Sequence, residues 1–166
     1  MLVQRNDGPW RSAFNRSCAQ FKEGFGSKTG NYWIGNQKLH EKTKNGDYKL
    51  KFDLQPSDSS NLYYAKYSEF KVLSENDKYK VEVGGYSGTA GYDAFGWHNN
   101  YPFSTYDKDN DFSEGNCAVR WHAGFWYNRC YYVGVNNNGS WMWWSYLEES
   151  SNLQKSRMWL EPKHCQ

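Results

Sequence analysis

The feature that most constrains the fold is the long stretch from Gly91 to about Asn152, which shows neither strand nor helix periodicity. It is rich in aromatic residues, glycine and asparagine. An irregular run of this length is uncommon in a compact domain unless a metal ion, a disulfide or a functional role accounts for it. We therefore expect an irregular C-terminal lobe that depends on such cross-links.

The chain before Gly91 carries regular secondary-structure signals. Within residues 46–54, Leu50, Phe52 and Leu54 alternate with charged residues, which predicts a half-buried strand. Residues 62–73 alternate similarly, and residues 79–91 predict a short strand that runs into a glycine-rich turn. Further strand pieces are expected at 31–35 and 157–162, and short helices at 14–26 and 36–44.

Composition narrows the class of partner. The chain has 9 Trp, 14 Tyr and 9 Phe, which suit an aromatic core and also an aromatic surface for sugars. Its 20 basic and 18 acidic residues are mixed, giving a net charge of +2, so no basic stripe marks a nucleic-acid partner. No apolar stretch reaches the length of a membrane span, and the first residues lack the apolar core of a signal peptide.

The four cysteines are Cys18, Cys117, Cys130 and Cys165. An even count in a small chain poor in aliphatic residues favours disulfides and an extracellular location, with buried free thiols as the alternative. Cys117 and Cys130 are spaced to close a short loop, worth roughly 3 kcal/mol on the chain-entropy model. Sequons at Asn15 and Asn138 would permit glycosylation of a secreted chain.

An acidic segment precedes the two central cysteines. Asp107, Asp109 and Asp111 alternate, and clustered carboxylate and main-chain oxygens are the ligands that calcium prefers. The segment is not an EF-hand, because Phe112 and Ala118 occupy the positions that need glycine and glutamate. A calcium loop of another kind and a solvated acidic turn are both compatible with the pattern.

Taken in order, the motifs resemble those of the fibrinogen-related domain found in fibrinogen, ficolins, tachylectins, tenascins and angiopoietins. The resemblance covers Leu2 to Pro162. The matching segments are "LVQRNDG", "FKEGFGSKTGNYWIGNQKLHEKT", "YKLKFDL", "YYAKYSEFKV", "YKVEVGGYSGTAGYDAF", "FSTYDKDND", "GNCA", "GFWYNRC" and "RMWLEP".

This resemblance implies an α+β fold with a twisted, mostly antiparallel sheet, short helices and an irregular C-terminal lobe cross-linked by calcium and a disulfide. One domain would span 1–166. Its parts would be a sheet-bearing lobe at about 1–90, a calcium and ligand lobe at about 91–152, and a returning strand at 153–166.

The resemblance also implies functional residues. Calcium ligands would be the side chains of Asp109 and Asp111 and the main-chain carbonyls of Ser113 and Gly115. Asp107 would contact these ligands without binding the ion itself, or would be a turn residue. The conserved disulfide would be Cys117–Cys130. In family lectins the peptide bond before the second cysteine is cis, and its amides bind the acetyl oxygen of N-acetyl sugars. The ligand-binding residues would then be Trp126, Tyr127, Arg129, Cys130 and Tyr131. For Trp126 and Tyr127 the alternative is that both rings belong to the core.

The sequence departs from the family pattern in three places. Tyr131 replaces the usual histidine after the second cysteine, and the segment after Cys130 is shorter, so Tyr131, Tyr132, Trp141 and Trp143 would have to rebuild the pocket wall. Cys18 stands where the family often has tryptophan, and Cys165 lies beyond the usual end. We expect a Cys18–Cys165 bridge, with a link to another chain as the alternative.

The function that follows is a secreted, calcium-dependent lectin of innate recognition whose partners are glycans, above all N-acetylated sugars. The alternative is a protein-interaction module that binds a receptor or matrix protein. We expect no enzyme, because His40, His98, His122 and His164 show no catalytic spacing and no phosphate-binding loop is present. The sequence does not decide the oligomeric state, and a homo-oligomer is one alternative, since relatives gain avidity by clustering weak sites.

Overall fold

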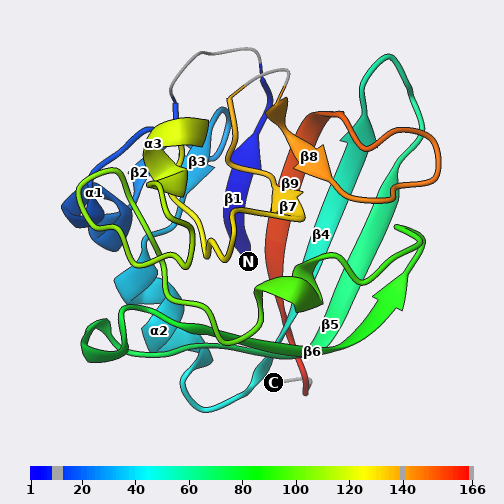
Figure 1. The fold of residues 1–166 in the computed structure, drawn as a ribbon. Coiled ribbons are helices and arrows are strands. Elements are labelled where there is room, and N and C mark those ends of the chain that lie inside the picture. The colour runs from blue at the N-terminus through cyan, green and yellow to red at the C-terminus, as the bar shows by residue number, and fades with distance from the viewer. Residues whose placement is uncertain (9–12, 139–140, 165–166) are drawn as a thin grey trace.

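The computed structural model describes residues 1–8, 13–138 and 141–164 (Figure 1). Short helices and a large sheet account for most of its regular structure. The helices are α1 (Cys18–Glu23), α2 (Asn36–Thr43) and α3 (Cys117–Trp121), with 3-10 turns η1 (Glu75–Asp77) and η2 (Phe95–His98). The strands are β1 (Leu2–Asn6), β2 (Phe25–Gly26), β3 (Tyr32–Trp33), β4 (Tyr48–Pro56), β5 (Tyr63–Val72), β6 (Val81–Gly88), β7 (Val133–Gly134), β8 (Trp143–Trp144) and β9 (Leu153–Pro162).

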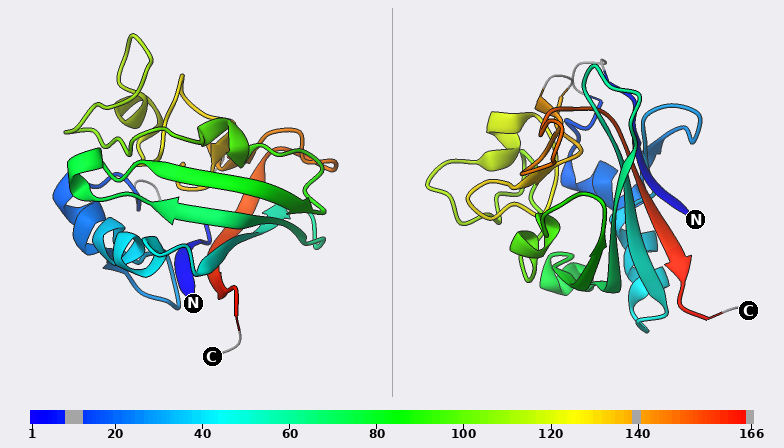
Figure 2. Two further views of the ribbon diagram at one scale, coloured as in Figure 1. Left: turned by 90° about the horizontal axis from the view of Figure 1, so that it is seen from below. Right: turned by 90° about the vertical axis from the view of Figure 1, so that its right-hand side faces the viewer.

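The main sheet has seven strands in the order β2-β3-β1-β9-β4-β5-β6, and all of its described pairs are antiparallel. The last strand, β9, lies between β1 and β4, so the C-terminal strand pairs with the N-terminal strand in the middle of the sheet. The sheet is visibly twisted (Figure 2). The expected class, an antiparallel sheet with short helices and a disulfide, is confirmed.

The irregular lobe packs on one face of this sheet (Figure 2). Alternation in β4 buries Leu50, Phe52 and Leu54 as the sequence predicts. The ring of Phe52 meets Phe95 at 5.1 Å and Trp144 at 5.0 Å between centroids. Because both partners belong to the irregular segment, the two halves of the molecule share one core.

Two local predictions need correction. The glycine-rich segment expected as a turn after residue 83 continues as part of β6, where it pairs with β5. Glycine permits this because Gly85 and Gly88 adopt φ angles of +70° and +140° that other residues rarely reach. The helix expected at 14–26 is shorter, because Ser17 caps α1 with a capping box and leaves Phe14 before the helix.

Buried polar side chains of β1 fix the irregular lobe to the sheet. Gln4 donates from its side-chain amide to the carbonyl of Val135 and to side-chain oxygens of Asn136 and Ser156. Asn6 donates to the carbonyls of Val135 and Asn137. These contacts supply hydrogen-bond partners to main-chain groups that no strand would satisfy. They position the chain that follows β7 and leads into β8.

Candidate functional site

The Cys117–Cys130 disulfide is present, as expected, with 5.5 Å between the Cα atoms. It joins the first residue of α3 to the loop before β7. Asn116 caps that helix by accepting a hydrogen bond from the amide of Val119. Cys18 forms no disulfide within the described residues, and burial raises the pKa of its thiol. Its expected partner, Cys165, lies outside the described residues, so the Cys18–Cys165 bridge stays a prediction.

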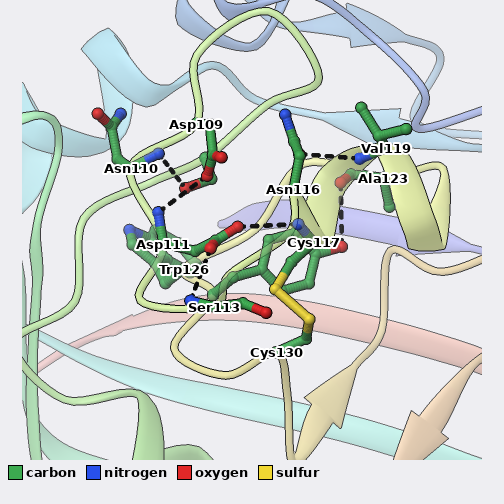
Figure 3. The surroundings of a disulfide bond; sticks show 12 residues. Asp109, Asn110, Asp111, Ser113, Asn116, Cys117, Val119, Ala123, Trp126 and Cys130 are labelled. Carbon is green, nitrogen blue, oxygen red and sulfur yellow. Dashed lines mark hydrogen bonds between the residues drawn. A yellow bond between two sulfur atoms is a disulfide. The ribbon is translucent and has the colours of Figure 1, made fainter.

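The acidic loop is built around Asp111. One carboxylate oxygen accepts the amide of Ser113 and the other accepts the amide of Cys117, each at 2.9 Å. Figure 3 shows Asp111 directed toward the start of α3, next to the disulfide. A single side chain thus ties the acidic loop to the cross-linked helix.

The acidic loop offers carboxylate and carbonyl oxygens, the kinds of ligand that calcium prefers. Burial raises the pKa of Asp111, two amide hydrogen bonds lower it, and the neighbouring carboxylate of Asp109 raises it again. Two crowded carboxylates are an arrangement that a cation relieves. The carbonyl oxygens of Ser113 and Gly115 accept no hydrogen bond from any residue the structure describes, so they are available as ligands.

The acidic side chains alone do not make a metal site. Among the described residues, no group of three or more His, Cys, Asp or Glu side chains is placed to hold an ion. Asp107 lies apart from the pair, because its carboxylate accepts hydrogen bonds from the amide of Cys18 and the hydroxyl of Thr105. Burial raises the pKa of Asp107, but these hydrogen bonds outweigh it and the net shift is downward. Its role is to attach the loop to α1.

His98 organises the chain on the other side of the disulfide. Its Nδ1 donates to the carbonyl of Trp126 at 2.8 Å, and its Nε2 accepts the amides of Tyr132 and Val133 at 3.2 and 3.0 Å. This pattern requires the neutral ring, and complete burial lowers the pKa of His98 to about 4. Sequence reasoning missed this role, since nothing in the neighbouring residues of His98 distinguishes it.

Trp126 and Tyr127 are both completely buried, which favours the core alternative over direct contact with ligand. The indole of Trp126 donates to the carbonyl of Tyr79 and packs against Trp33 and Phe103. The hydroxyl of Tyr127 donates to the carbonyl of Ala123. Both rings are therefore part of the core beneath the loop.

The remaining expected ligand residues line a surface pocket of about 540 Å³. They are Arg129, Cys130 and Tyr131, and the peptide bond between Arg129 and Cys130 is cis, as the resemblance implied. Arg120, Trp121, Trp141, Trp143 and Asn152 complete the wall. Of the aromatic residues suggested to rebuild the pocket, Tyr132 does not line it, because its ring stacks on Trp97 at 4.4 Å.

The pocket wall combines rings with free main-chain donors. Trp121 meets Tyr131 at 5.0 Å and Trp141 at 5.8 Å between ring centroids, in edge-to-face contacts. The main-chain amides of Arg129, Cys130 and Tyr131 donate to no acceptor in the part of the chain that the structure describes. Aromatic surfaces beside a few unpaired polar groups are typical of small-ligand sites.

Residues 1–164 match the profile of one protein family, described as the C-terminal globular domain of fibrinogen beta and gamma chains. Fibrinogen-like protein 1 from Bos taurus is 42% identical over 149 residues, covering 82% of this chain and 47% of that protein. Ficolin-3 from Homo sapiens is 40% identical over 137 residues, covering 82% and 44%. The chain thus spans about half the length of these curated relatives.

Solved structures agree with the sequence match. The fibrinogen-like globe domain of human ANGPTL6 superimposes with a TM-score of 0.88 at 31% identity, covering 99% of this chain and 78% of that one. A lamprey fibrin D-dimer complexed with the peptide Gly-His-Arg-Pro-amide gives a TM-score of 0.84 at 28% identity, covering 99% and 62%.

Three further expectations can now be assessed. No helix within the described ranges has the length and apolar character to cross a bilayer. The matched family is non-enzymatic, and the relatives are secreted proteins, which confirms the expectations of no enzyme and an extracellular location. The sheet, the disulfide and the match over residues 1–164 lead to one conclusion: the chain belongs to the family of fibrinogen C-terminal globular domains.

Proposed function

We propose that this chain is an extracellular, calcium-stabilised lectin module that binds acetylated glycans, above all N-acetylated sugars, in innate recognition. The binding site is the pocket formed by Arg129, Cys130 and Tyr131 with Trp121, Trp141 and Trp143. The observation that carries the proposal is the set of unpaired main-chain amides within this aromatic wall. An acetyl group offers a carbonyl oxygen to such amides and a methyl group to a ring.

The size of the pocket is compatible with this ligand. Sites for small molecules have volumes of roughly 300–1,000 Å³, and the value here of about 540 Å³ suits one or two sugar rings. Trp141 is 58% exposed at the pocket rim, where a flat ring is available to the apolar face of a sugar.

In this proposal calcium acts on the pocket through a hydrogen bond and the disulfide. Asp109, Asp111 and the carbonyls of Ser113 and Gly115 would hold the ion, which neutralises the paired carboxylates. Asp111 also accepts the amide of Cys117, and Cys117 is bonded to Cys130 in the pocket wall. A calcium ion that fixes the conformation of the acidic loop would thereby also fix the position of the residues that contact ligand.

The test is retention on immobilised N-acetylglucosamine and N-acetylgalactosamine in the presence of calcium. Elution by EDTA and, separately, by free acetate or the acetylated sugar is expected. Trp141→Ala should lose retention while Tyr64→Ala, which removes an exposed ring from β5 on the sheet, should keep it. A folded, calcium-loaded protein that passes through both resins would reject the acetyl-glycan proposal.

A second function is a protein-interaction module, and one observation favours it. The structurally similar lamprey fibrin D-dimer is complexed with a Gly-His-Arg-Pro-amide peptide, so a protein that contains this fold binds a peptide. The shortened segment after Cys130 points in the same direction. Binding of extracellular proteins that survives the Trp141→Ala substitution and saturating N-acetylglucosamine would favour this alternative.

A further inference from the structure

We propose that the chain has a second small-molecule site, a pocket of about 220 Å³ beside η1 that binds small aromatic carboxylates. This η1 pocket has the buried residues Asn36, Tyr79 and Phe103 in its inner wall and the exposed residues Lys78 and Lys108 at its mouth. It shares no residue with the pocket beside the disulfide, so the proposal goes beyond the function proposed above.

The residue that leaves this space open is Cys18. It is a half-buried residue of α1 that lines the η1 pocket, at the position where the family often has tryptophan. A thiol is much smaller than an indole, so a tryptophan at this position would occupy much of the pocket. The opening is therefore a feature of chains with a small residue here.

The inner wall is aromatic and preformed. Phe103 is only 5% exposed, and its ring meets those of Trp33 at 5.8 Å and Trp126 at 5.2 Å between centroids. Tyr79 is buried too, its hydroxyl donates to the side chain of Gln37, and its carbonyl accepts the indole of Trp126. Two rings fixed in this way offer a flat aromatic group a surface that needs no rearrangement.

Asn36 adds one unused hydrogen-bond donor to this wall. The residue is only 2% exposed, and its Oδ1 accepts the indole Nε1 of Trp33 at 3.0 Å. An indole nitrogen can only donate, which fixes the orientation of the Asn36 amide. Its Nδ2 donates to no residue that the structure describes. Because a buried donor without an acceptor is costly, a ligand oxygen at this point would be favoured.

The charges at the mouth favour an anion. Lys78 and Lys108 form neither an ion pair nor a side-chain hydrogen bond with any described residue. Glu75 is the acidic residue of the wall, and it is already paired with Lys22 at 2.9 Å. Two cations without a described partner therefore face whatever enters the pocket, and a carboxylate would be attracted to both.

These groups together define the ligand class. A carboxylate would lie at the mouth near Lys78 and Lys108, an aromatic ring would pack on Phe103 and Tyr79, and an oxygen at the far end would accept from Asn36. The volume is below the roughly 300–1,000 Å³ of drug-sized sites, which limits the ligand to about one ring. An aromatic acid with a hydroxyl or carbonyl opposite its carboxylate has these features in this order.

The test is an NMR titration of the ¹⁵N-labelled chain in calcium with 4-hydroxybenzoate. We expect the side-chain amide signals of Asn36 and the main-chain signals of Lys78 to shift, with a Kd of about 1 mM for so small a ligand. The neutral 4-hydroxybenzamide should bind about fivefold more weakly, because exposed ion pairs contribute modestly. Benzoate, which lacks the oxygen for Asn36, should bind about threefold more weakly.

Substitutions assign the binding to this pocket. Cys18→Trp should fill the space and abolish binding, while Ala19→Trp, which adds the same ring at an exposed position of α1, should keep it. Lys78→Gln/Lys108→Gln should bring the ratio of acid to amide affinity close to one. Its matched control Lys44→Gln/Lys155→Gln, which removes two exposed lysines outside the pocket, should keep the ratio.

The lysine variants keep the test decisive if Cys18→Trp fails to fold. Absence of a saturable shift of the Asn36 signals up to about tenfold the expected Kd would overturn the proposal. So would binding that persists in a folded Cys18→Trp variant. Loss of 4-hydroxybenzoate binding in Trp141→Ala would place the ligand beside the disulfide instead, and would also overturn it. Sugar retention is measured separately, so failure here leaves the lectin proposal standing.

Discussion

The sheet and the irregular segment from 91 to 152 belong to one core but are stabilised in different ways. In the sheet, long antiparallel ladders such as β4 with β9 satisfy the main chain, and alternate residues such as Phe52 supply apolar area. In the irregular segment, single side chains form hydrogen bonds with the main-chain groups. His98 satisfies three main-chain groups and Asp111 satisfies two.

The contrast has consequences for both stability and function. Each sheet contact is one of many similar ones, and its energy is part of a cooperative whole. Each of these side chains, such as His98 or Asp111, fixes one particular loop, so its removal should destabilise that loop more than the rest of the molecule. The candidate metal and ligand residues all lie in this second region, where a few anchors define the geometry.

The largest expected effect comes from Phe52→Ala. Phe52 is completely buried and packs against Phe95 and Trp144, so the substitution removes contacts from both regions at once. We expect the free energy of unfolding to fall by about 3–5 kcal/mol. Urea unfolding followed by far-ultraviolet and near-ultraviolet circular dichroism should show one shifted transition.

A second phenylalanine provides the control for this prediction. Phe112 in the acidic loop is 58% exposed, and Phe112→Ala should change the free energy of unfolding by less than about 1 kcal/mol. Two separate transitions in the Phe52→Ala variant would contradict the shared core, because the irregular segment would then be shown to persist without the sheet.

Removing the disulfide should separate the two regions more clearly. We expect Cys117→Ser/Cys130→Ser to cost roughly 3 kcal/mol, because the unfolded chain gains the freedom of an open loop. Hydrogen exchange should accelerate at residues 107–133, while β4, β5 and β9 stay protected. Val119→Ala, which shortens an exposed side chain of α3, serves as control. Equal acceleration in the sheet would show that the cross-link stabilises the whole fold rather than the loop.

The sheet was largely predictable from the sequence, because its signals are local. Alternation at Leu50, Phe52 and Leu54 gave the inward face of β4. The prediction failed at Gly85 and Gly88, where glycine continues β6 instead of ending it. Glycine alone does not distinguish a turn from a strand residue of unusual φ, and here the pairing with β5 decides.

The candidate site was only partly predictable, because its contacts join residues far apart in the chain. The alternating aspartates located the acidic loop, and the disulfide pairing followed from the resemblance to a family. His98, whose partners lie at 126, 132 and 133, carried no local signal. Trp126 and Tyr127 were assigned to ligand by position, whereas their burial follows from packing against distant rings such as Trp33.

Calcium removal is the next test of the comparison, because the candidate ligands of the ion all lie in the irregular region. At a calcium concentration about a hundredfold above Kd, the ion would add about 2.7 kcal/mol to the free energy of unfolding. EDTA should therefore lower Tm and abolish sugar retention together. Asp109→Ala should lose the calcium response, since Asp109 contributes little else than a 3.4 Å contact to the amide of Asp111.

The matched control for the calcium prediction is Glu82→Ala. Glu82 is an exposed acidic residue of β6, and its removal should leave the calcium response intact. Equal values of Tm with and without chelator in the wild type would contradict a structural calcium ion in the acidic loop.

The smallest expected effect is a pH dependence that originates in His98. Its pKa is about 4 in the folded chain against 6.5 when exposed, so the unfolded chain binds the proton first. The neutral ring of His98 therefore makes its full contribution to the free energy of unfolding above pH 6.5. This contribution declines as the pH falls and levels off below the folded pKa. Between pH 7 and pH 5 this amounts to about 2 kcal/mol. Urea unfolding at both pH values should show that loss in the wild type and a smaller loss in His98→Gln, whose side chain does not titrate. Equal losses in the two proteins would assign the pH dependence to other groups and leave His98 with only its hydrogen bonds.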